Sequence, residues 1–324
     1  MSCSAWIDDF AVDDTASDVD TDGDTDGDTD SDGDSDGDGD VDTGEPSLCG
    51  EKVVAPSGNT LEFCAVRSGT PTLGCLEGKS GESSCIADET PAHRVTMRSY
   101  IIGRYEVTGA QFARFVAERP EWARDGAMAV DKCNSSYLLN WINDNPPSSL
   151  AQTPVTSICW YAARAFCQWL GIGFDLPTEA QWEYAARGQF DGQDGRPYRR
   201  YPFGNTPNCD LGNFENCEAA VMPVGSTEGV SPFGLYDMGG NAWEWVRDWY
   251  RDDHYCDPAE LGYFTRPDCD LDFSWQNPTG PSSGTTKVLR GGSWYHPAEM
   301  MRTAKRHGVS PNSSSNLSGF RCAR

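Results

Sequence analysis

A serine, a histidine and two methionines lie close together near the C-terminus, and their side chains could take part in metal chemistry. Ser293 follows a Gly-Gly pair, His296 comes three residues later, and residues 300–301 are both methionine. Imidazole nitrogen and thioether sulfur are both ligands that suit copper(I). A thioether is neutral, however, and cannot exchange with a substrate as a thiolate does, and residues 295–301 contain no cysteine. The segment therefore offers soft ligands without the thiolates that copper-dependent thiol oxidation uses.

The negative charge of the chain is concentrated at its N-terminal end. Of the net charge of −25, residues 1–45 contribute −18, with seventeen Asp, one Glu and no Lys or Arg. Every even-numbered residue from Asp18 to Asp42 is Asp, and charges so closely spaced repel one another. We therefore predict a disordered, extended tether over 1–45 and one folded domain over 46–324. That domain carries 32 acidic and 25 basic residues with no basic stripe, so nucleic-acid binding is not expected.

The thirteen cysteines indicate an oxidising compartment. Several of them lie at short separations that bracket loops: Cys75 with Cys85, Cys209 with Cys217, and Cys256 with Cys269. We therefore expect an extracytoplasmic protein, either periplasmic or at the cell surface. Cys3 stands alone ahead of the acidic tether, an arrangement that resembles a lipidated bacterial lipoprotein attached to a membrane; a free terminal thiol is the alternative. No apolar run approaches the roughly 18 residues that a transmembrane helix needs.

A few regular elements can be predicted from capping signals and apolar periodicity. Two capping boxes, Thr108 with Gln111 and Thr178 with Gln181, each open a segment of helical periodicity. A third helix is predicted over 160–170, with a glycine directly after it. Most of the remaining chain is rich in Gly, Pro, Asn and Asp and is typical of loops. Short strands are predicted at 94–97, 100–105 and 288–290.

Four runs of sequence resemble the formylglycine-generating enzyme family, also called the sulfatase-modifying factor family. They are RGGSW at 290–294, GFRC at 319–322, GNAWEW at 240–245 and LPTEAQWE at 176–183. The resemblance covers nearly all of the predicted domain. It implies an α+β fold, the formylglycine-generating-enzyme fold with its C-type-lectin-like core, rich in loops and stapled by disulfides.

The resemblance also bears on the cysteines. Active family members carry two cysteines just after the GGSW run, which hold copper(I) and oxidise a substrate cysteine, whereas 295–301 has none. The interval between Trp294 and Arg302 is also shorter than in active members. The resemblance therefore implies the family fold without its chemistry, and copper is not expected as a cofactor. It further implies a disulfide between Cys167 and Cys322, after which Cys49 with Cys64 and Cys133 with Cys159 complete six pairs by elimination.

Structural calcium is the cofactor that the resemblance implies. Family members bind Ca²⁺ around the NxWEW run through oxygen ligands at close spacing, as this ion prefers. The matching ligands here are the backbone oxygens of Asp237, Gly240 and Ala242 and the carboxylate of Glu244. The alternative is that this carboxylate pairs with an arginine. A second family site begins with an Asn-apolar pair, which would be Asn213 and Phe214.

Three functions are consistent with these features. The first is an exported, non-catalytic scaffold, stabilised by calcium, that presents loops to a peptide, a glycan or a surface protein. The second is an oxidoreductase of the formylglycine-generating type that acts on protein cysteine with a divergent metal site; a third is an accessory to an active homologue. For several residues of the expected ligand face, buried packing or salt bridges are the alternative role. The expected ligand face comprises Ser293, Trp294, His296, Met301, Arg302 and Arg306.

Overall fold

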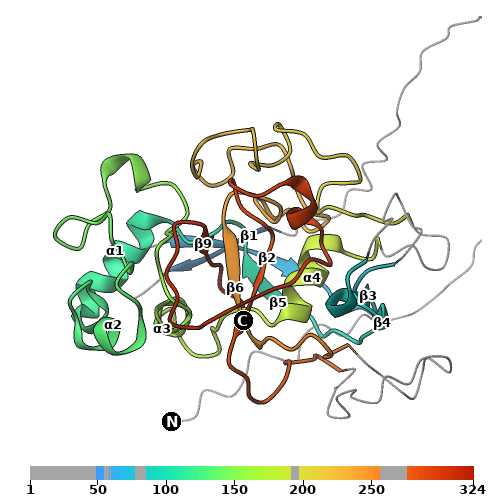
Figure 1. Ribbon diagram of the computed structural model, residues 1–324, viewed down its shortest axis with the longest axis horizontal. Helices are drawn as coiled ribbons and strands as arrows, with labels where there is room; N and C mark the ends of the chain where they lie inside the picture. The colour runs from blue at the N-terminus through green and yellow to red at the C-terminus, as the bar shows by residue number, and fades with distance from the viewer. Residues whose placement is uncertain (1–48, 55–57, 59, 77–84, 191–196, 256–275) are drawn as a thin grey trace, which may run out of the picture. The chain divides into compact units, whose positions relative to one another are not determined.

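The structure, a computed structural model, describes residues 49–54, 58, 60–76, 85–190, 197–255 and 276–324 (Figure 1). The helices are α1 (Gly109–Glu118), α2 (Ala127–Lys132), α3 (Trp160–Trp169) and α4 (Glu179–Arg187), with short 3-10 turns η1 (Ala87–Glu89), η2 (Pro120–Trp122), η3 (Ser148–Leu150) and η4 (Ala298–Met301). The strands are β1 (Cys49–Val54), β2 (Thr60–Val66), β3 (Thr72–Leu73), β4 (His93–Arg94), β5 (Tyr100–Gly103), β6 (Trp243–Trp249), β7 (Lys287–Arg290), β8 (His307–Val309) and β9 (Ser318–Gly319). In these described ranges no helix is both long and apolar enough to cross a membrane.

The strands form three sheets. β1, β2 and β5 make an antiparallel sheet in that order, and β3 pairs with β4. The third sheet has the order β8-β7-β6-β9, in which only the β6–β9 pair is parallel. In this sheet Glu244 lies opposite Arg290, and Trp249 lies opposite Lys287. The C-terminal segment returns to the first sheet, where Ala323 bridges Ile102 of β5.

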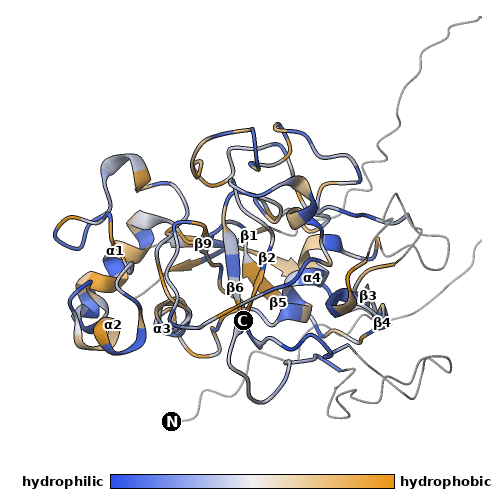
Figure 2. Ribbon diagram, in the orientation of Figure 1, coloured by the Kyte–Doolittle hydropathy of each residue, from blue (hydrophilic) through white to orange (hydrophobic). Residues whose placement is uncertain are grey.

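Strands β6 and β7 contribute to two apolar cores, because successive side chains of a strand point to opposite faces. Trp245 and Leu289 belong to the core that includes α1 and α3. Their neighbours Val246 and Val288 belong to the second core, with side chains of α4, β2 and β5. In Figure 2, hydrophobic and hydrophilic residues alternate along α1, as expected for a helix with one buried face.

The three predicted helices are present. Both capping boxes form, with Thr108 Oγ1 accepting from the Gln111 backbone N–H and Thr178 Oγ1 accepting from that of Gln181. The strand predicted at 94–97 is shorter and earlier, because only His93 and Arg94 pair with β3. β6 was predicted as part of a motif and not as a strand. Its residues are buried on both faces, so it lacks the alternation that marks a half-exposed strand.

Five disulfides join cysteines of the described ranges, and all five were among the six expected pairs. They are Cys49–Cys64, Cys75–Cys85, Cys133–Cys159, Cys167–Cys322 and Cys209–Cys217. The Cys167–Cys322 bridge ties α3 to the C-terminal segment across a sequence separation of 155. The sixth expected pair, Cys256 with Cys269, lies outside the described residues, as does Cys3.

Candidate functional site

The Gly-Gly turn after β7 carries the candidate site. Gly291 and Gly292 have positive φ angles of 93° and 77°, a conformation that glycine adopts without strain. Backbone hydrogen bonds fix the turn to the loop before β6: Gly240 N–H donates to Gly291 O at 2.9 Å, and Trp294 N–H donates to Asn241 O at 3.0 Å. Ser293 is therefore held, fully buried, beneath the segment that follows it.

His296 is locked in one tautomer by two polar neighbours. Trp243 Nε1–H donates to His296 Nδ1 at 3.2 Å, and the Ser293 hydroxyl lies 2.7 Å from the same nitrogen. An indole N–H can only donate, so this Nδ1 is an acceptor and the imidazole proton is on Nε2. Burial lowers the pKa of His296 below its ordinary value of 6.5, and Glu215 opposes this shift. The ring is thus neutral near pH 7, with Nε2–H as its remaining donor.

A pocket of about 450 Å³ opens beside His296. Its second wall is the loop closed by the Cys209–Cys217 disulfide, and the two walls are joined where Glu215 N–H donates to His296 O at 2.9 Å. Two carboxylates line it, those of Glu215 and Glu218, and none of its lining residues is Lys or Arg. The complete lining is Glu215, Asn216, Cys217, Glu218, Ala219, Trp294, Tyr295, His296 and Pro297.

Four residues of the expected ligand face do not line this pocket, namely Ser293, Met301, Arg302 and Arg306. Met301 is completely buried. The Arg302 guanidinium binds both carboxylate oxygens of Glu89, at 2.6 and 2.8 Å, and the Arg306 guanidinium binds both oxygens of Glu179, at 2.7 and 2.9 Å. Paired and buried, these arginines bind the segment after η4 to the rest of the fold. Of the six expected residues, Trp294 and His296 line the pocket, and Ser293 supports His296 from below.

The buried pairs around α4 form one network. Arg290 contacts both acidic residues of this helix, Glu179 at 3.3 Å and Glu183 at 2.5 Å. Burial alone would raise the pKa of Glu179, but the charges of Arg306 and Arg290 lower it to about 2. Glu179 is therefore ionised at neutral pH, and its removal from water is offset by two guanidinium groups.

Two of the residues expected to bind calcium, Glu244 and Asp237, interact with one arginine, Arg321. Glu244 accepts from Arg321 through both carboxylate oxygens, each at 2.7 Å, and from Trp182 Nε1 at 2.8 Å. Arg321 shares its positive charge with two further buried carboxylates, those of Glu106 and Asp237. Burial, together with the other two carboxylates, raises the pKa of Glu106 well above its ordinary value. Burial also raises the pKa of Asp237 to about 6.

These three carboxylates are chemically suited to calcium, since they are hard oxygen donors with more negative charge than one guanidinium offsets. Among the described residues, however, no three His, Cys, Asp or Glu side chains are grouped so that they could hold a metal ion. The arginine pairing expected as the alternative for Glu244 is present. Calcium at Asp237, Gly240, Ala242 and Glu244 stays a prediction.

At the second expected calcium position the side chain is engaged locally. Asn213 Nδ2 donates to Ala220 O at 2.9 Å, and its Oδ1 accepts from Glu218 N–H at 3.3 Å. The Phe214 carbonyl accepts from Cys217 N–H at 2.9 Å. In this structure Asn213 and Phe214 therefore stabilise the pocket loop. A calcium ion there also stays a prediction.

The family assignment rests on comparisons that agree with this fold. The model of the sulfatase-modifying factor enzyme 1-like domain matches residues 51–324. The chain belongs to this family. The formylglycine-generating enzyme of Streptomyces coelicolor is 33% identical over 285 residues, covering 75% of this chain and 83% of that enzyme. A protein from Bos taurus named inactive C-alpha-formylglycine-generating enzyme 2 is 27% identical over 85% of this chain and 92% of that protein.

Other family relatives are larger or more distant. The serine/threonine-protein kinase pkn1 of Chlamydia pneumoniae is 30% identical over 81% of this chain but only 38% of the kinase, so the chain spans less than half of that relative. Among solved structures, Treponema denticola variable protein 1 matches with a TM-score of 0.61 at 22% identity, over 84% of this chain and 98% of that one. This likeness concerns the fold. The expected α+β fold, that of formylglycine-generating enzyme with a C-type-lectin-like core, is confirmed.

The donors present do not fit a copper site of two thiolates, the kind that active family members carry. All ten cysteines in the described ranges are disulfide-bonded. The Met301 sulfur lies in the interior beside Gly212, and Met300 packs against the core that includes α1 and α3. His296 is left as the soft ligand at the pocket, with its Nδ1 already engaged.

Two parts of the site were not predicted from the sequence. The loop wall at 215–219 is brought to the pocket by a distant backbone contact, and only the Cys209–Cys217 spacing hinted that it folds on itself. His307 is the second part: its ring centroid lies 5.4 Å from that of Trp243, and the same tryptophan donates a hydrogen bond to His296. Nothing in the spacing of the histidines connects these two.

Proposed function

We propose that this protein is an extracytoplasmic, non-catalytic member of the family that binds a positively charged segment of a peptide or protein. The binding site is the pocket between the loop at 215–219 and the segment 294–297. The five disulfides support a location in an oxidising compartment. One observation carries the proposal. The neutral imidazole of His296, hydrogen-bonded to Ser293 and Trp243, lines the pocket beside the Gly-Gly turn, where active family members carry thiolates.

The choice of a cationic ligand follows from the lining. Glu215 and Glu218 are exposed at the pocket, and no cation among the lining residues balances them. Tyr295, which is 63% exposed, and Trp294 add aromatic rings, whose faces attract ammonium and guanidinium groups. The volume lies within the range of roughly 300–1,000 Å³ that is usual for small-ligand sites, so one or two side chains of a partner can enter.

The proposal is tested by calorimetric titration of the full-length protein with short arginine-containing peptides. The double variant Glu215→Gln/Glu218→Gln should weaken binding about tenfold or more, since two charged contacts are removed. Glu228→Gln removes an exposed charge outside the pocket and should leave the affinity unchanged. Both variants retain the acidic tether, so its attraction for the peptide cancels in the comparison. Equal affinities for the two variants would exclude this pocket as the binding site.

Calcium has a structural role in this proposal. A cation near Glu106, Asp237 and Glu244 would offset their unbalanced charge and rigidify the loop before β6, to which the Gly-Gly turn is hydrogen-bonded. The chemistry that it would supply is electrostatic stabilisation of the folded state. Calcium would therefore support the pocket without touching the ligand.

A second function, oxidation of a protein cysteine with a divergent metal site, is favoured by one observation. His296 and His307 both pack against Trp243, with ring centroids 5.8 and 5.4 Å from the indole. Two imidazoles can bind copper. Copper-dependent conversion of a cysteine peptide that is lost in the His296→Ala variant would select this function over the first.

A further inference from the structure

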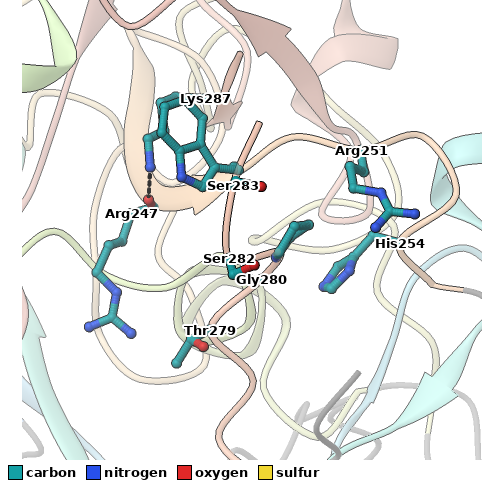
Figure 3. A pocket seen from close by; sticks show the side chains of 10 residues that line it. Arg247, Arg251, His254, Thr279, Gly280, Ser282, Ser283 and Lys287 are labelled. Carbon is teal, nitrogen blue, oxygen red and sulfur yellow. Dashed lines mark hydrogen bonds between the residues drawn. The ribbon is translucent and has the colours of Figure 1, made fainter. Parts of the chain in front are cut away.

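A second pocket, which shares no residue with the first, lies at the end of β6 and the start of β7 (Figure 3). Its volume is about 540 Å³. Arg247 and Trp249 belong to β6, Arg251 follows the strand, and all three line the pocket. Figure 3 shows Arg247 on one side of the segment 279–283, with Arg251 and His254 on the other.

The lining of this pocket is basic, although the whole chain has a net charge of −25. It contains Arg247, Arg251, His254 and Lys287, and no Asp or Glu. Arg251 is paired with Asp253 at 3.0 Å. Within the described ranges, in contrast, the Arg247 guanidinium has neither a hydrogen bond nor an ion pair. A half-exposed guanidinium is thus left available in the pocket, with its fork of donors suited to an oxyanion.

Lys287 adds a buried positive charge. The residue is 4% exposed, and its ammonium lies 3.7 Å from the ring centre of Trp249 and 4.0 Å from that of Trp160. Its Nζ donates to the Arg247 carbonyl at 2.8 Å, and no carboxylate among the described residues forms an ion pair with it. Burial lowers the pKa of Lys287 to about 8, so it is still charged at neutral pH. A buried ammonium without an anionic partner is costly unless a ligand supplies one.

The acid that interacts most strongly with this ammonium is the buried Asp248, which does not line the pocket. Its Oδ2 accepts from Glu179 N–H at 2.9 Å, and burial raises its pKa to about 7. It therefore offsets the Lys287 charge only in part. The segment that covers it passes close because residue 280 is glycine: a Cβ there would lie 2.6 Å from Asp248 Oδ1.

We propose that this pocket binds a small organic oxyanion, a molecule with a sulfate, phosphate or carboxylate group. Arg247 would hold the oxyanion through paired N–H donors, and Lys287 would supply charge from beneath it. The hydroxyls of Thr279, Ser282 and Ser283, which also line the pocket, can bind the remaining polar atoms of the molecule. Such a site is independent of the acidic pocket beside His296, and the two would take ligands of opposite charge.

The test is calorimetric titration of the full-length protein with glucose 6-sulfate, glucose 6-phosphate and glucuronate in separate experiments. At least one of them should bind saturably, and the tightest identifies the anionic group. Arg247→Gln should weaken that binding about tenfold or more, since it removes a charge-assisted bidentate contact. Arg114→Gln, at an exposed position on α1, is the charge-matched control and should bind like the wild type.

The variant is expected to fold, because the Arg247 side chain makes no hydrogen bond or ion pair in the described part of the chain. An unchanged melting temperature would show this directly. The proposal is overturned if none of the three anions binds, or if the Arg247 and Arg114 variants bind equally well.

Discussion

The arginine network around α4 and the pocket beside His296 lie on the same stretch of chain, yet they differ in how their polar groups are satisfied. Arg302 and Arg306 are buried and bind carboxylates through two hydrogen bonds each. At the pocket, Glu215 and Glu218 are exposed and no cation lines the cavity with them. The first region fixes the fold, and the second is free to interact with a ligand. Similarity to the family in the first region therefore says little about chemistry in the second.

The largest difference between the two regions should appear in stability. Arg306→Met leaves Glu179 buried with one guanidinium fewer, and breaking a buried pair costs about 3–5 kcal/mol. His296→Ala, at the pocket, should cost less, about 1–3 kcal/mol, since it removes two hydrogen bonds of a half-buried side chain. Urea unfolding of both variants measures this. Similar losses would mean that the pocket segment is part of the framework.

Removing different disulfides should change the free energy of unfolding by different amounts. Replacing both Cys167 and Cys322 by Ala should lower the free energy of unfolding by about 2–5 kcal/mol, because a long loop is released in the unfolded chain. The Cys75–Cys85 bridge closes a separation of only 10, against 155 for the first. On loop entropy, its removal should cost roughly 2 kcal/mol less. Equal costs measured by denaturant titration would contradict this ranking.

The dependence of stability on pH should identify a buried carboxyl group with a raised pKa, that of Asp248. The pKa of Asp248 is raised from 3.8 to about 7 when folded, so its contribution to stability is complete below pH 3.8 and is lost as pH rises toward 7. Asp248→Asn can keep the hydrogen bond from Glu179 N–H but cannot ionise. The variant should therefore lose less stability than the wild type between pH 4 and pH 7. Parallel curves would show that Asp248 is not the group responsible.

Calcium should produce the smallest of these effects, on the loop that joins the two regions. Millimolar EDTA should lower the melting temperature of the wild type, because an ion that binds only the folded state stabilises it. In Glu244→Gln the shift should disappear, because the one predicted carboxylate ligand is lost, whereas Asp248→Asn, a similar loss of a buried carboxylate, should retain it. A wild-type melt that EDTA leaves unchanged would remove calcium from this account.

The sequence predicted the parts of the fold that depend on local signals. The capping boxes at Thr108 and Thr178 mark the starts of α1 and α4, because both partners of a capping box lie within four residues. β6 carries no such local signal, since burial of both faces removes its alternation. The acidic wall of the pocket depends on a contact between Glu215 and His296, 81 residues apart in the chain. Such a contact is fixed by packing and could not be foreseen from spacing.

The most direct test of the central claim is a search for turnover. The full-length protein is incubated with copper(I), oxygen and a peptide that contains Cys-x-Pro-x-Arg, and the peptide mass is followed by mass spectrometry. A protein whose pocket segment holds a neutral imidazole in place of a thiolate pair should leave the peptide thiol unchanged beyond the metal-only blank. Protein-dependent conversion of the cysteine to an aldehyde would contradict the assignment as a non-catalytic binding protein.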